Sequence, residues 1–284
     1  MRTDLESIEQ HILELSRDLG REIAPDEPID LDSLERAEIA FALEERLGVR
    51  LTADLSFRTL AEAVREIAGS LGGSQQPALG PSTCHLQWLA LAAIRPLMNR
   101  YYRVEVLGTQ HVPQHGPGVL AMNHDSLLDI LVLAHASPRR VWFMAKAELF
   151  PGGISSWFFD ALGGFPVRRG GYDLRAIRAG LEVLRTGRLL GMYPEGTRGR
   201  ALGPFLPGSA WLALATGAPL VPAAITGTYE AMPRGSRIPR RTRVRIRLGE
   251  PLKPGSENEP RARLARAREV TAELRSAVEK LLET

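Results

Sequence analysis

Residues 118–134 read GVLAMNHDSLLDILVLA, and this stretch decides the fold class. Its first five residues are an apolar run that predicts a buried strand, and residues 130–134 are an apolar run that predicts a helix. A polar turn, residues 123–129, separates them. Open α/β sheets repeat this strand, turn and helix order, and they bind ligands at the carboxyl ends of their strands. We therefore expect an α/β domain, a mixed sheet flanked by helices, with functional side chains in this turn.

The turn holds a histidine and an aspartate in the pattern H-x-x-x-x-D. The unperturbed pKa of histidine lies near neutrality, so His124 is a candidate general base. Asp129 is placed to orient the imidazole, as acids do in other catalytic pairs. No serine or cysteine nucleophile of an obvious type accompanies them, so the base would act directly on the hydroxyl of a bound acceptor. The turn also fits a capping box from Ser126 to Asp129, in which Asp129 serves only the helix N-terminus. The turn alone leaves both interpretations open.

Length, composition and cysteine content limit the class of protein. The chain has 284 residues, which favours two domains, and a hydrophobic fraction of 44% allows a substantial core. The single cysteine, Cys84, excludes a disulfide scaffold and indicates a reducing compartment. The N-terminal residues lack the apolar core of a signal peptide, and no run approaches the roughly 18 apolar residues that span a bilayer. We expect a cytoplasmic location.

Charge divides the chain into two parts. Residues 1–70 hold 17 acidic and 8 basic side chains, a net charge of −9, and the remainder holds 16 and 28, a net charge of +12. Residues 71–83 are rich in Gly, Pro and polar side chains, which is typical of a flexible linker. We therefore predict an acidic domain over 1–70, a linker over 71–83 and a basic domain over 84–284. Such a tether keeps the two domains at about millimolar effective concentration.

The acidic domain has the pattern of a small helical bundle. Apolar residues recur every three to four positions from Leu5 to Leu19, and two further amphipathic stretches span 34–47 and 59–68. A bundle of this size is marginally stable and needs tight packing.

The stretch 29–35, IDLDSLE, lies where the second of these helices begins. Ser33 fits the N-cap position, with Asp32 and Glu35 at the positive helix end. Asp32-Ser33-Leu34, Glu38-Ile39 and residues 42–49 together resemble an acyl carrier protein, and the resemblance covers nearly all of residues 1–70. It implies an all-α four-helix bundle in which Ser33 carries 4′-phosphopantetheine, attached by a phosphopantetheinyl transferase, whose thiol holds an acyl chain as a thioester.

One residue departs from the carrier pattern. Leu31 stands where the family often has a small residue, which bears on how the modifying enzyme recognises the loop.

The basic domain contains three further motifs. Residues 164–169 read GFPVRR, 193–198 read YPEGTR and 220–223 read LVPA. Adjacent arginines suit an anionic group, because guanidinium binds phosphate bidentately, although a solvated basic turn has the same composition. In the second motif, backbone N–H groups around a glycine, a threonine and an arginine suit a phosphate, and the glutamate suits a substrate hydroxyl or the arginine beside it.

The ordered set of four motifs, H-x-x-x-x-D included, resembles the glycerolipid acyltransferases, typified by 1-acylglycerol-3-phosphate acyltransferase. The resemblance covers roughly residues 85–250. It implies that His124 is the base that deprotonates the acceptor hydroxyl and that Asp129 orients it. The residues implied to bind the acceptor phosphate are Arg168, Glu195, Gly196, Thr197 and Arg198. The implied donor is an acyl thioester, acyl carrier protein or acyl-CoA, and the implied acceptor is a lysophospholipid. No metal is expected.

One departure puts the acceptor in question. The family usually has a lysine soon after the Glu-Gly-Thr-Arg loop, in a Phe-Lys-x-Gly pattern, whereas residues 205–208 here read FLPG. A lysophospholipid with another headgroup, an amino-acid lipid or a polyketide alcohol is therefore an alternative acceptor. A non-catalytic module that docks acyl carriers or binds lipid is a second alternative.

Two stretches suggest contact with an anionic membrane surface. The apolar spacing of residues 86–98 predicts a helix that contains Trp88, and such a helix suits either the membrane interface or the core. Arginines alternate over 241–247, so a strand there would present four guanidinium groups on one face. This face suits an anionic leaflet or the acidic domain, and no nucleic-acid recognition motif accompanies it. We therefore expect a peripheral protein at the inner face of the cell membrane.

Overall fold

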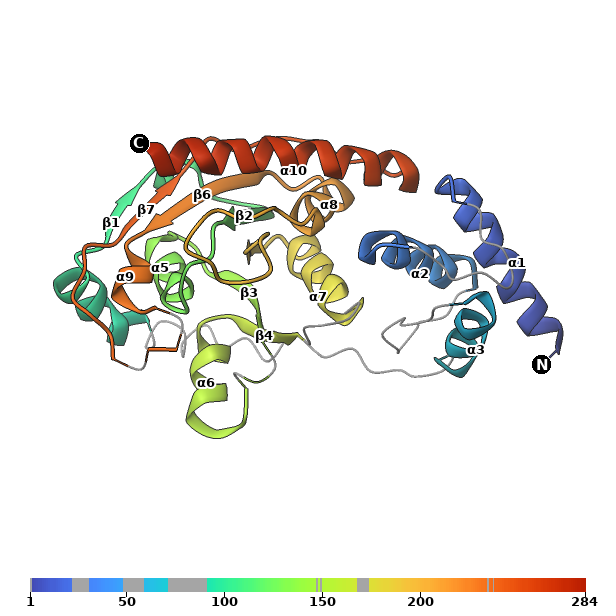
Figure 1. The fold of residues 1–284 in the computed structure, drawn as a ribbon, viewed down its shortest axis with the longest axis horizontal. Coiled ribbons are helices and arrows are strands. Elements are labelled where there is room, and N and C mark those ends of the chain that lie inside the picture. The colour runs from blue at the N-terminus through green and yellow to red at the C-terminus, as the bar shows by residue number, and fades with distance from the viewer. Residues whose placement is uncertain are drawn as a thin grey trace.

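The structure is a computed structural model. It describes an N-terminal helical part and an α/β part of the chain. It covers residues 2–21, 31–47, 59–70, 91–146, 148, 150–167, 174–233, 235–236 and 238–284. Figure 1 shows the N-terminal helices at one end of an elongated molecule and the α/β part at the other. The linker expected at 71–83 and Trp88 lie outside the described residues.

The α/β part is built on a mixed sheet, as expected. Its strands lie in the order β1-β7-β6-β2-β5-β3-β4. The strands from β6 to β4 are parallel to one another, whereas β7 runs antiparallel to β6, and β1 is parallel to β7. The strand bounds are β1 (Glu105–Leu107), β2 (Gly118–Met122), β3 (Val141–Lys146), β4 (Gly164–Val167), β5 (Leu189–Met192), β6 (Leu220–Thr226) and β7 (Arg245–Leu248).

Helices cover both faces of this sheet. Successive side chains of a strand point to opposite faces, and β2 follows this rule. Val119 and Ala121 pack in one core with α7, α8 and α10, and Leu120 and Met122 pack in another with α5. In Figure 1, α10 lies along the top of the sheet. The bounds are η1 (Leu97–Tyr101), η2 (Thr109–His111), α5 (Leu128–Ala136), α6 (Gly153–Ala161), α7 (Leu174–Arg185), α8 (Gly208–Thr216), α9 (Thr228–Ala231) and α10 (Pro260–Glu283).

The N-terminal part contains α1 (Arg2–Asp18), α2 (Ser33–Leu47) and α3 (Leu60–Ser70). Apolar side chains from all three helices form one core, which includes Ile8, Ile12, Ile39, Leu43 and Ile67. The three helices that the periodicity predicts are therefore present. The fourth helix of the expected bundle has no counterpart among the described residues, and 48–58 lie outside them.

The expected row of four arginines is only partly a strand. β7 begins at Arg245, so Arg241 and Arg243 precede it. Arg245 donates to Glu105, and Arg247 donates to the carbonyl of Leu281, so both guanidinium groups of the strand are engaged within the fold. Among the described residues, no helix combines the length and the apolar character that a bilayer crossing requires.

Candidate active site

The catalytic pair expected from the sequence is assembled at the carboxyl end of β2. The chain leaves β2 at Met122, and α5 begins at Leu128. Between them, His124 Nδ1 lies 2.9 Å from Asp129 Oδ2. The histidine side chain is 5% exposed and the aspartate side chain is fully buried. The short separation and the burial fix the ring in one orientation.

Asp129 also performs the capping role that was the alternative interpretation. Besides the imidazole, its Oδ2 accepts hydrogen bonds from the backbone N–H groups of Asp125 and Ser126, both at 2.8 Å. The Ser126 hydroxyl accepts in turn from the Leu128 N–H at 3.3 Å. One carboxylate therefore binds the backbone of the turn that leads into α5 and also holds His124, so the two interpretations are compatible.

Tyr193 forms one wall of the histidine site. Its ring stacks on the imidazole with a centroid separation of 4.1 Å and an interplanar angle of 26°. Its hydroxyl is buried and has no hydrogen-bond partner among the described residues. Burial, and secondarily the charge of Asp129, raise the pKa of Tyr193 well above its ordinary value, so this hydroxyl stays protonated. The sequence motif contained Tyr193, but its spacing gave no sign of this stack.

The loop after β5 binds the backbone of the histidine. Glu195 Oε1 accepts from the His124 N–H at 2.8 Å, and Gly199 N–H donates to the His124 carbonyl at 2.9 Å. Glu195 Oε2 accepts from the Gly203 N–H at 2.8 Å. Backbone amides therefore bind both oxygens of Glu195, which differs from the expected contact with a substrate hydroxyl or with Arg198. In this structure its carboxylate joins the loop to the catalytic turn.

Residues 196–198 connect Glu195 to Gly199, and these two flanking residues both bind the backbone of His124. Gly196 adopts a left-handed backbone with φ of 66°, and its N–H donates to the Tyr193 carbonyl. This leaves the exposed Thr197 and the half-buried Arg198 as the polar side chains that the loop offers to an anion. Arg168, the other predicted phosphate ligand, lies outside the described residues.

Asn123 is a positioning residue that the sequence reasoning missed. Its side-chain amide donates to the Ile225 carbonyl at 2.9 Å and accepts from the Ile225 N–H at 2.8 Å. These bonds tie the end of β2 to the end of β6, and the residue is 3% exposed. An amide directly after a strand, next to the histidine, was the available signal.

Asp125 was also missed. Burial, followed by the charge of Asp129, raises the pKa of Asp125 to about 7, with smaller contributions from Glu195 and Glu230. A hydrogen bond from the Asn123 amide opposes this shift. A carboxyl group that changes charge near neutral pH therefore adjoins the catalytic pair.

The predicted attachment residue, Ser33, is the first residue of α2, and Asp32 rather than Ser33 caps this helix. Asp32 Oδ1 accepts from the N–H groups of Leu34 and Glu35, both at 2.9 Å. Glu35 Oε2 accepts from the Asp32 N–H at 2.9 Å, which completes a reciprocal capping box. The interpretation of Ser33 as N-cap is wrong, because the preceding aspartate fills that position.

Comparison with known proteins identifies the α/β part. Residues 103–226 match the family model described as Acyltransferase. We refer to the α/β part, which contains this match, as the acyltransferase domain. The crystal structure of the 1-acyl-sn-glycerophosphate acyltransferase PlsC from Thermotoga maritima is similar, with a TM-score of 0.55 and 28% identity, covering 71% of this chain and 80% of that one.

Curated relatives of the acyltransferase domain agree with this assignment. A 1-acyl-sn-glycerol-3-phosphate acyltransferase from Bacillus subtilis is 28% identical over 56% of this chain and 79% of its own length. A lyso-ornithine lipid O-acyltransferase from Pseudomonas aeruginosa is 33% identical over 51% of this chain and 54% of its own. The chain spans about half the length of the plant and mammalian relatives that it matches. The predicted resemblance to 1-acylglycerol-3-phosphate acyltransferases is thereby confirmed for the acyltransferase domain.

Within the described residues, no group of three or more His, Cys, Asp or Glu side chains is arranged to hold a metal ion.

Proposed function

We propose that the protein transfers a fatty acyl chain from a thioester to a hydroxyl group of a lysophospholipid such as 1-acylglycerol-3-phosphate. The observation that carries this proposal is the buried contact of 2.9 Å between His124 and Asp129. The motif that supplies this pair lies within the matched acyltransferase domain.

In the proposed reaction, Asp129 accepts a hydrogen bond from Nδ1–H of His124, so Nε2 carries the lone pair that takes a proton. The acceptor hydroxyl loses its proton to Nε2 while its oxygen attacks the thioester carbonyl. The tetrahedral intermediate collapses, the carbon–sulfur bond breaks, and the departing thiolate takes the proton from the imidazolium. Asp129 stabilises the positive ring between these two steps.

The acceptor is held by its anionic group at the loop that adjoins the histidine. Thr197 and Arg198 are the residues that we assign to this contact, together with Arg168 from the sequence motif. Guanidinium groups form bidentate, charge-assisted bonds to phosphate, which suits this role. Glu195 supports the site by binding the His124 N–H and the Gly203 N–H.

The test measures acyl transfer by a His124→Ala variant. The readout is the release of free thiol from an acyl-CoA donor. General-base catalysis contributes about 10²–10⁴ in rate, so we expect a loss of at least that size with little change in acceptor binding. His115→Ala is the matched control, because His115 is an exposed histidine in a turn before β2. Near-normal turnover of His124→Ala would contradict the mechanism. An absence of turnover with any donor in the unmodified protein would favour a non-catalytic lipid-binding module.

The donor in this proposal is an acyl thioester on 4′-phosphopantetheine at Ser33, on a free acyl carrier protein, or on coenzyme A. The assignment of Asp32 as the N-cap supports Ser33 as the attachment residue, because the start of α2 is capped by the aspartate and does not require the serine. Co-expression with a phosphopantetheinyl transferase should add the mass of one arm to the intact protein. Ser33→Ala should abolish this increase, and an unchanged mass with an active transferase would remove the carrier role.

A second candidate acceptor is a lipid without a glycerophosphate headgroup. The chain has Leu206 where the family pattern has lysine, and this leucine is 60% exposed. One relative is named as a lyso-ornithine lipid O-acyltransferase. Profiling turnover over lysophosphatidic acid, other lysophospholipids and a lyso-amino-acid lipid separates the candidates. Leu206→Lys should shift the preference toward the phosphate-bearing acceptor.

We place the reaction at an anionic membrane surface, at the inner face of the cell membrane. Supporting this are the large apolar side chains exposed in the acyltransferase domain, which include Leu97, Trp157 and Ile238. Sedimentation with vesicles that contain anionic lipid should retain the protein, and neutral vesicles should retain less of it. Equal recovery with both vesicle types would contradict the charge dependence.

A further inference from the structure

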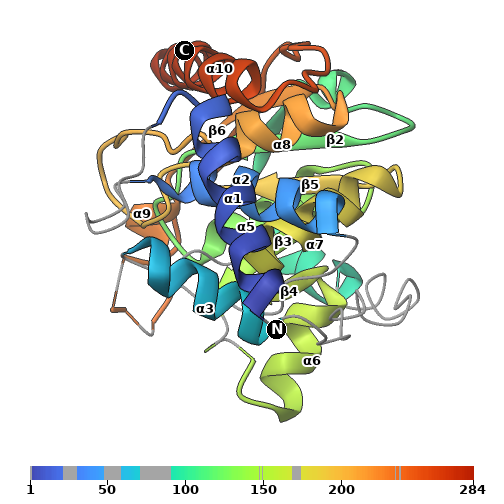
Figure 2. The ribbon, with the colours of Figure 1, turned by 90° about the vertical axis from the view of Figure 1, so that its right-hand side faces the viewer.

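The N-terminal part of the chain rests on a basic and aromatic surface of the acyltransferase domain. We call this the docking surface and define it by four residues from three helices: Arg178 on α7, Trp211 on α8, and Arg263 and Arg268 on α10. Its occupant is α2. Figure 2 views the molecule from the side of the N-terminal helices and shows α2 in front of α7 and α8, below α10.

Glu38 lies at the centre of this contact. Its side chain is 2% exposed. Oε1 accepts from Trp211 Nε1 and from Arg263 Nε, both at 2.7 Å, and Oε2 accepts from Arg263 Nη2 at 2.6 Å. A guanidinium that binds both carboxylate oxygens fixes direction as well as distance. Because both charges are largely withdrawn from water, removing either one leaves the other buried and unpaired.

Further contacts flank this centre along α2. Toward the end of the helix, Arg178 pairs with Glu44, and Phe41 stacks on Trp211 with a centroid separation of 6.0 Å. At the start of the helix, Arg268 lies 3.0 Å from Asp32.

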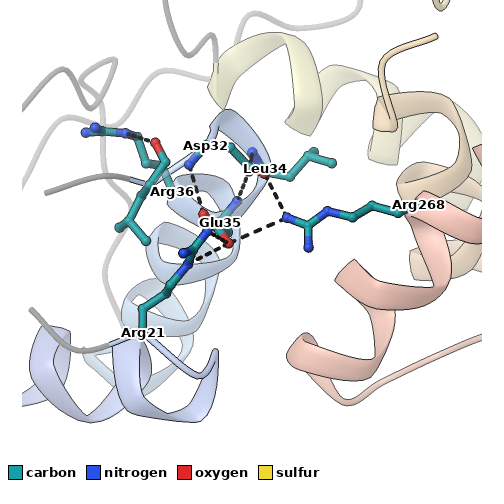
Figure 3. A network of polar contacts seen from close by, with 7 residues as sticks. Arg21, Asp32, Leu34, Glu35, Arg36 and Arg268 are labelled. Atoms are coloured by element: carbon teal, nitrogen blue, oxygen red, sulfur yellow. Dashed lines mark hydrogen bonds and ion pairs between the residues drawn. The ribbon is translucent and has the colours of Figure 1, made fainter. Parts of the chain in front are cut away.

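The contact at the start of α2 lies next to the predicted attachment residue. Figure 3 shows Arg268 extending from α10 toward the first turn of α2, where Asp32 and Glu35 lie. Leu34 is 6% exposed and belongs to the core of the acyltransferase domain rather than to that of the N-terminal helices. The two neighbours of Ser33, Asp32 and Leu34, are therefore both bound to the acyltransferase domain.

The contacting residues of α2 follow one another at every third position: Asp32, Glu35, Glu38, Phe41 and Glu44. An α-helix has 3.6 residues per turn, so each step of three residues returns to nearly the same side with a shift of about 60°, and the row winds partly around α2. Apolar residues that alternate with this row, Ala37, Ile39, Ala40 and Leu43, pack in the core of the N-terminal helices. The acidic row is thus the part of α2 that the basic side chains of the docking surface contact.

The docking surface is joined to the catalytic loop. Trp211 lies about one helical turn beyond Pro207, where the loop after β5 ends. The preceding residue, Leu206, donates its N–H to the Pro194 carbonyl at 2.8 Å, next to Glu195. From the other side, Arg275 of α10 donates to the Gly203 carbonyl. The helices that hold α2 therefore also hold the loop that binds His124.

We propose that the docking surface holds α2 as a carrier helix in cis, so that a thioester arm on Ser33 serves the catalytic site of its own chain. This inference rests on the proposed carrier function of Ser33. The tether alone supplies about millimolar carrier, and docking adds orientation to proximity. The charges at the contact make docking dependent on salt, and the exposed Arg268–Asp32 pair is the most readily screened.

The experiment compares Arg263→Ala with Arg266→Ala in the full-length protein. Arg266 is the matched control, because it lies on the same helix and pairs with Glu269 and Glu273 of that helix. Small-angle scattering reports docking through the radius of gyration. The rate of single-turnover acyl transfer from the arm on Ser33 to lysophosphatidic acid is then compared with the rate from acyl-CoA. The ratio of the first rate to the second reports the use of the carrier in cis. Glu38→Gln is the second variant, since it keeps the shape of the side chain and removes the charge.

We expect Arg263→Ala and Glu38→Gln to increase the radius of gyration by about a tenth or more and to lower the ratio of rates at least about tenfold. Arg266→Ala should change neither quantity. An unchanged radius in both variants, or an expanded protein with an unchanged ratio, would overturn the inference. Failure of Ser33 to accept an arm would remove the carrier function and with it the donor role of docking. The scattering comparison would then still show whether Arg263 holds α2.

Discussion

Two helix N-termini in this protein use the same capping device for different ends. At α5, the carboxylate of Asp129 binds two backbone N–H groups and the imidazole of His124. At α2, Asp32 and Glu35 bind each other's backbone N–H groups, and the carboxylate of Glu35 also pairs with Arg21. The first cap is part of the proposed catalytic pair. The second is made by Asp32 and Glu35, on either side of the predicted attachment residue Ser33.

The difference shows that a capping motif and a functional residue are not alternatives. A carboxylate has two oxygens and several lone pairs, so it can satisfy a helix terminus and orient a neighbour together. Conversely, at the start of α2 the cap is Asp32, which accepts from the N–H groups of Leu34 and Glu35. At α5 a substitution of Asp129 should therefore affect both activity and stability. At α2 the two effects should fall on different residues, with stability depending on Asp32 and function on Ser33.

The largest effect is expected at Asp129. Asp129→Asn keeps an oxygen for the backbone amides and loses the charge that fixes the histidine tautomer, so turnover should fall by about 10⁴. Asp129→Ala should lose as much activity and also leave buried N–H groups unpaired, which costs about 1–3 kcal/mol for each such group. Measurement of kcat/KM together with urea unfolding checks both. Equal activity of Asp129→Asn and the unmodified protein would show that Asp129 serves only as a cap.

The second effect concerns the loop that binds the histidine backbone. Glu195→Ala leaves the N–H groups of His124 and Gly203 without their carboxylate partner, so the loop should loosen and turnover should fall by about 10²-fold, as for misplacement of a catalytic group. Glu195→Gln keeps one acceptor oxygen and should lose less. Steady-state kinetics on both variants measures this order, and a reversed order would exclude a bridging role.

The third effect is expected at α2, where the cap and the predicted functional residue are two different side chains. Ser33→Ala should abolish attachment of the arm and leave the melting temperature unchanged. Asp32→Ala should lower the free energy of unfolding by about 1 kcal/mol, the usual cost of losing an N-cap. Intact-mass analysis and thermal unfolding of both variants provide the measurement. Destabilisation by Ser33→Ala that equals or exceeds that of Asp32→Ala would return the capping role to the serine.

The smallest effect is expected from Asp125. Its folded-state pKa of about 7 lies above the usual value of 3.8, so the folded state favours the protonated form. The stability that this proton contributes is complete below pH 4 and is lost as the pH rises toward and through 7. Asparagine does not titrate, so Asp125→Asn removes this pH dependence. The free energy of unfolding of the variant minus that of the unmodified protein should therefore be larger at pH 8 than at pH 5, by about 1 kcal/mol after allowance for solvent screening of a partly exposed group. Unfolding curves at both pH values measure the difference, and an equal effect at both would contradict the shifted pKa.

Local patterns predicted the elements that depend on neighbouring residues. The stretch at 118–134 became β2 and α5, because an apolar run, a polar turn and a second apolar run follow one another there. The same turn predicted the contact of His124 with Asp129, since Asp129 lies five positions after His124. The same reasoning applies to α10, in which Leu264, Val270, Leu274 and Val278 recur at helical spacing and are buried.

Contacts that depend on strand order were not predictable from the sequence. Glu195 and Tyr193 meet His124 because β5 lies next to β2 in the sheet, and sequence spacing does not reveal that order. The acidic residues of α2 have the composition of a solvated helix surface. Their burial requires arginines more than 100 residues away in the sequence, so only the folded structure shows it.

The nitrogen resonances of the His124 ring provide the most direct test of the catalytic pair. Long-range ¹H–¹⁵N spectra of protein labelled in histidine, compared with those of His124→Ala for assignment, report which ring nitrogen carries the proton when the imidazole is neutral. With Asp129 Oδ2 at 2.9 Å from Nδ1, the proton should reside on Nδ1 and leave Nε2 as the base. A proton on Nε2 of the neutral ring would contradict the account.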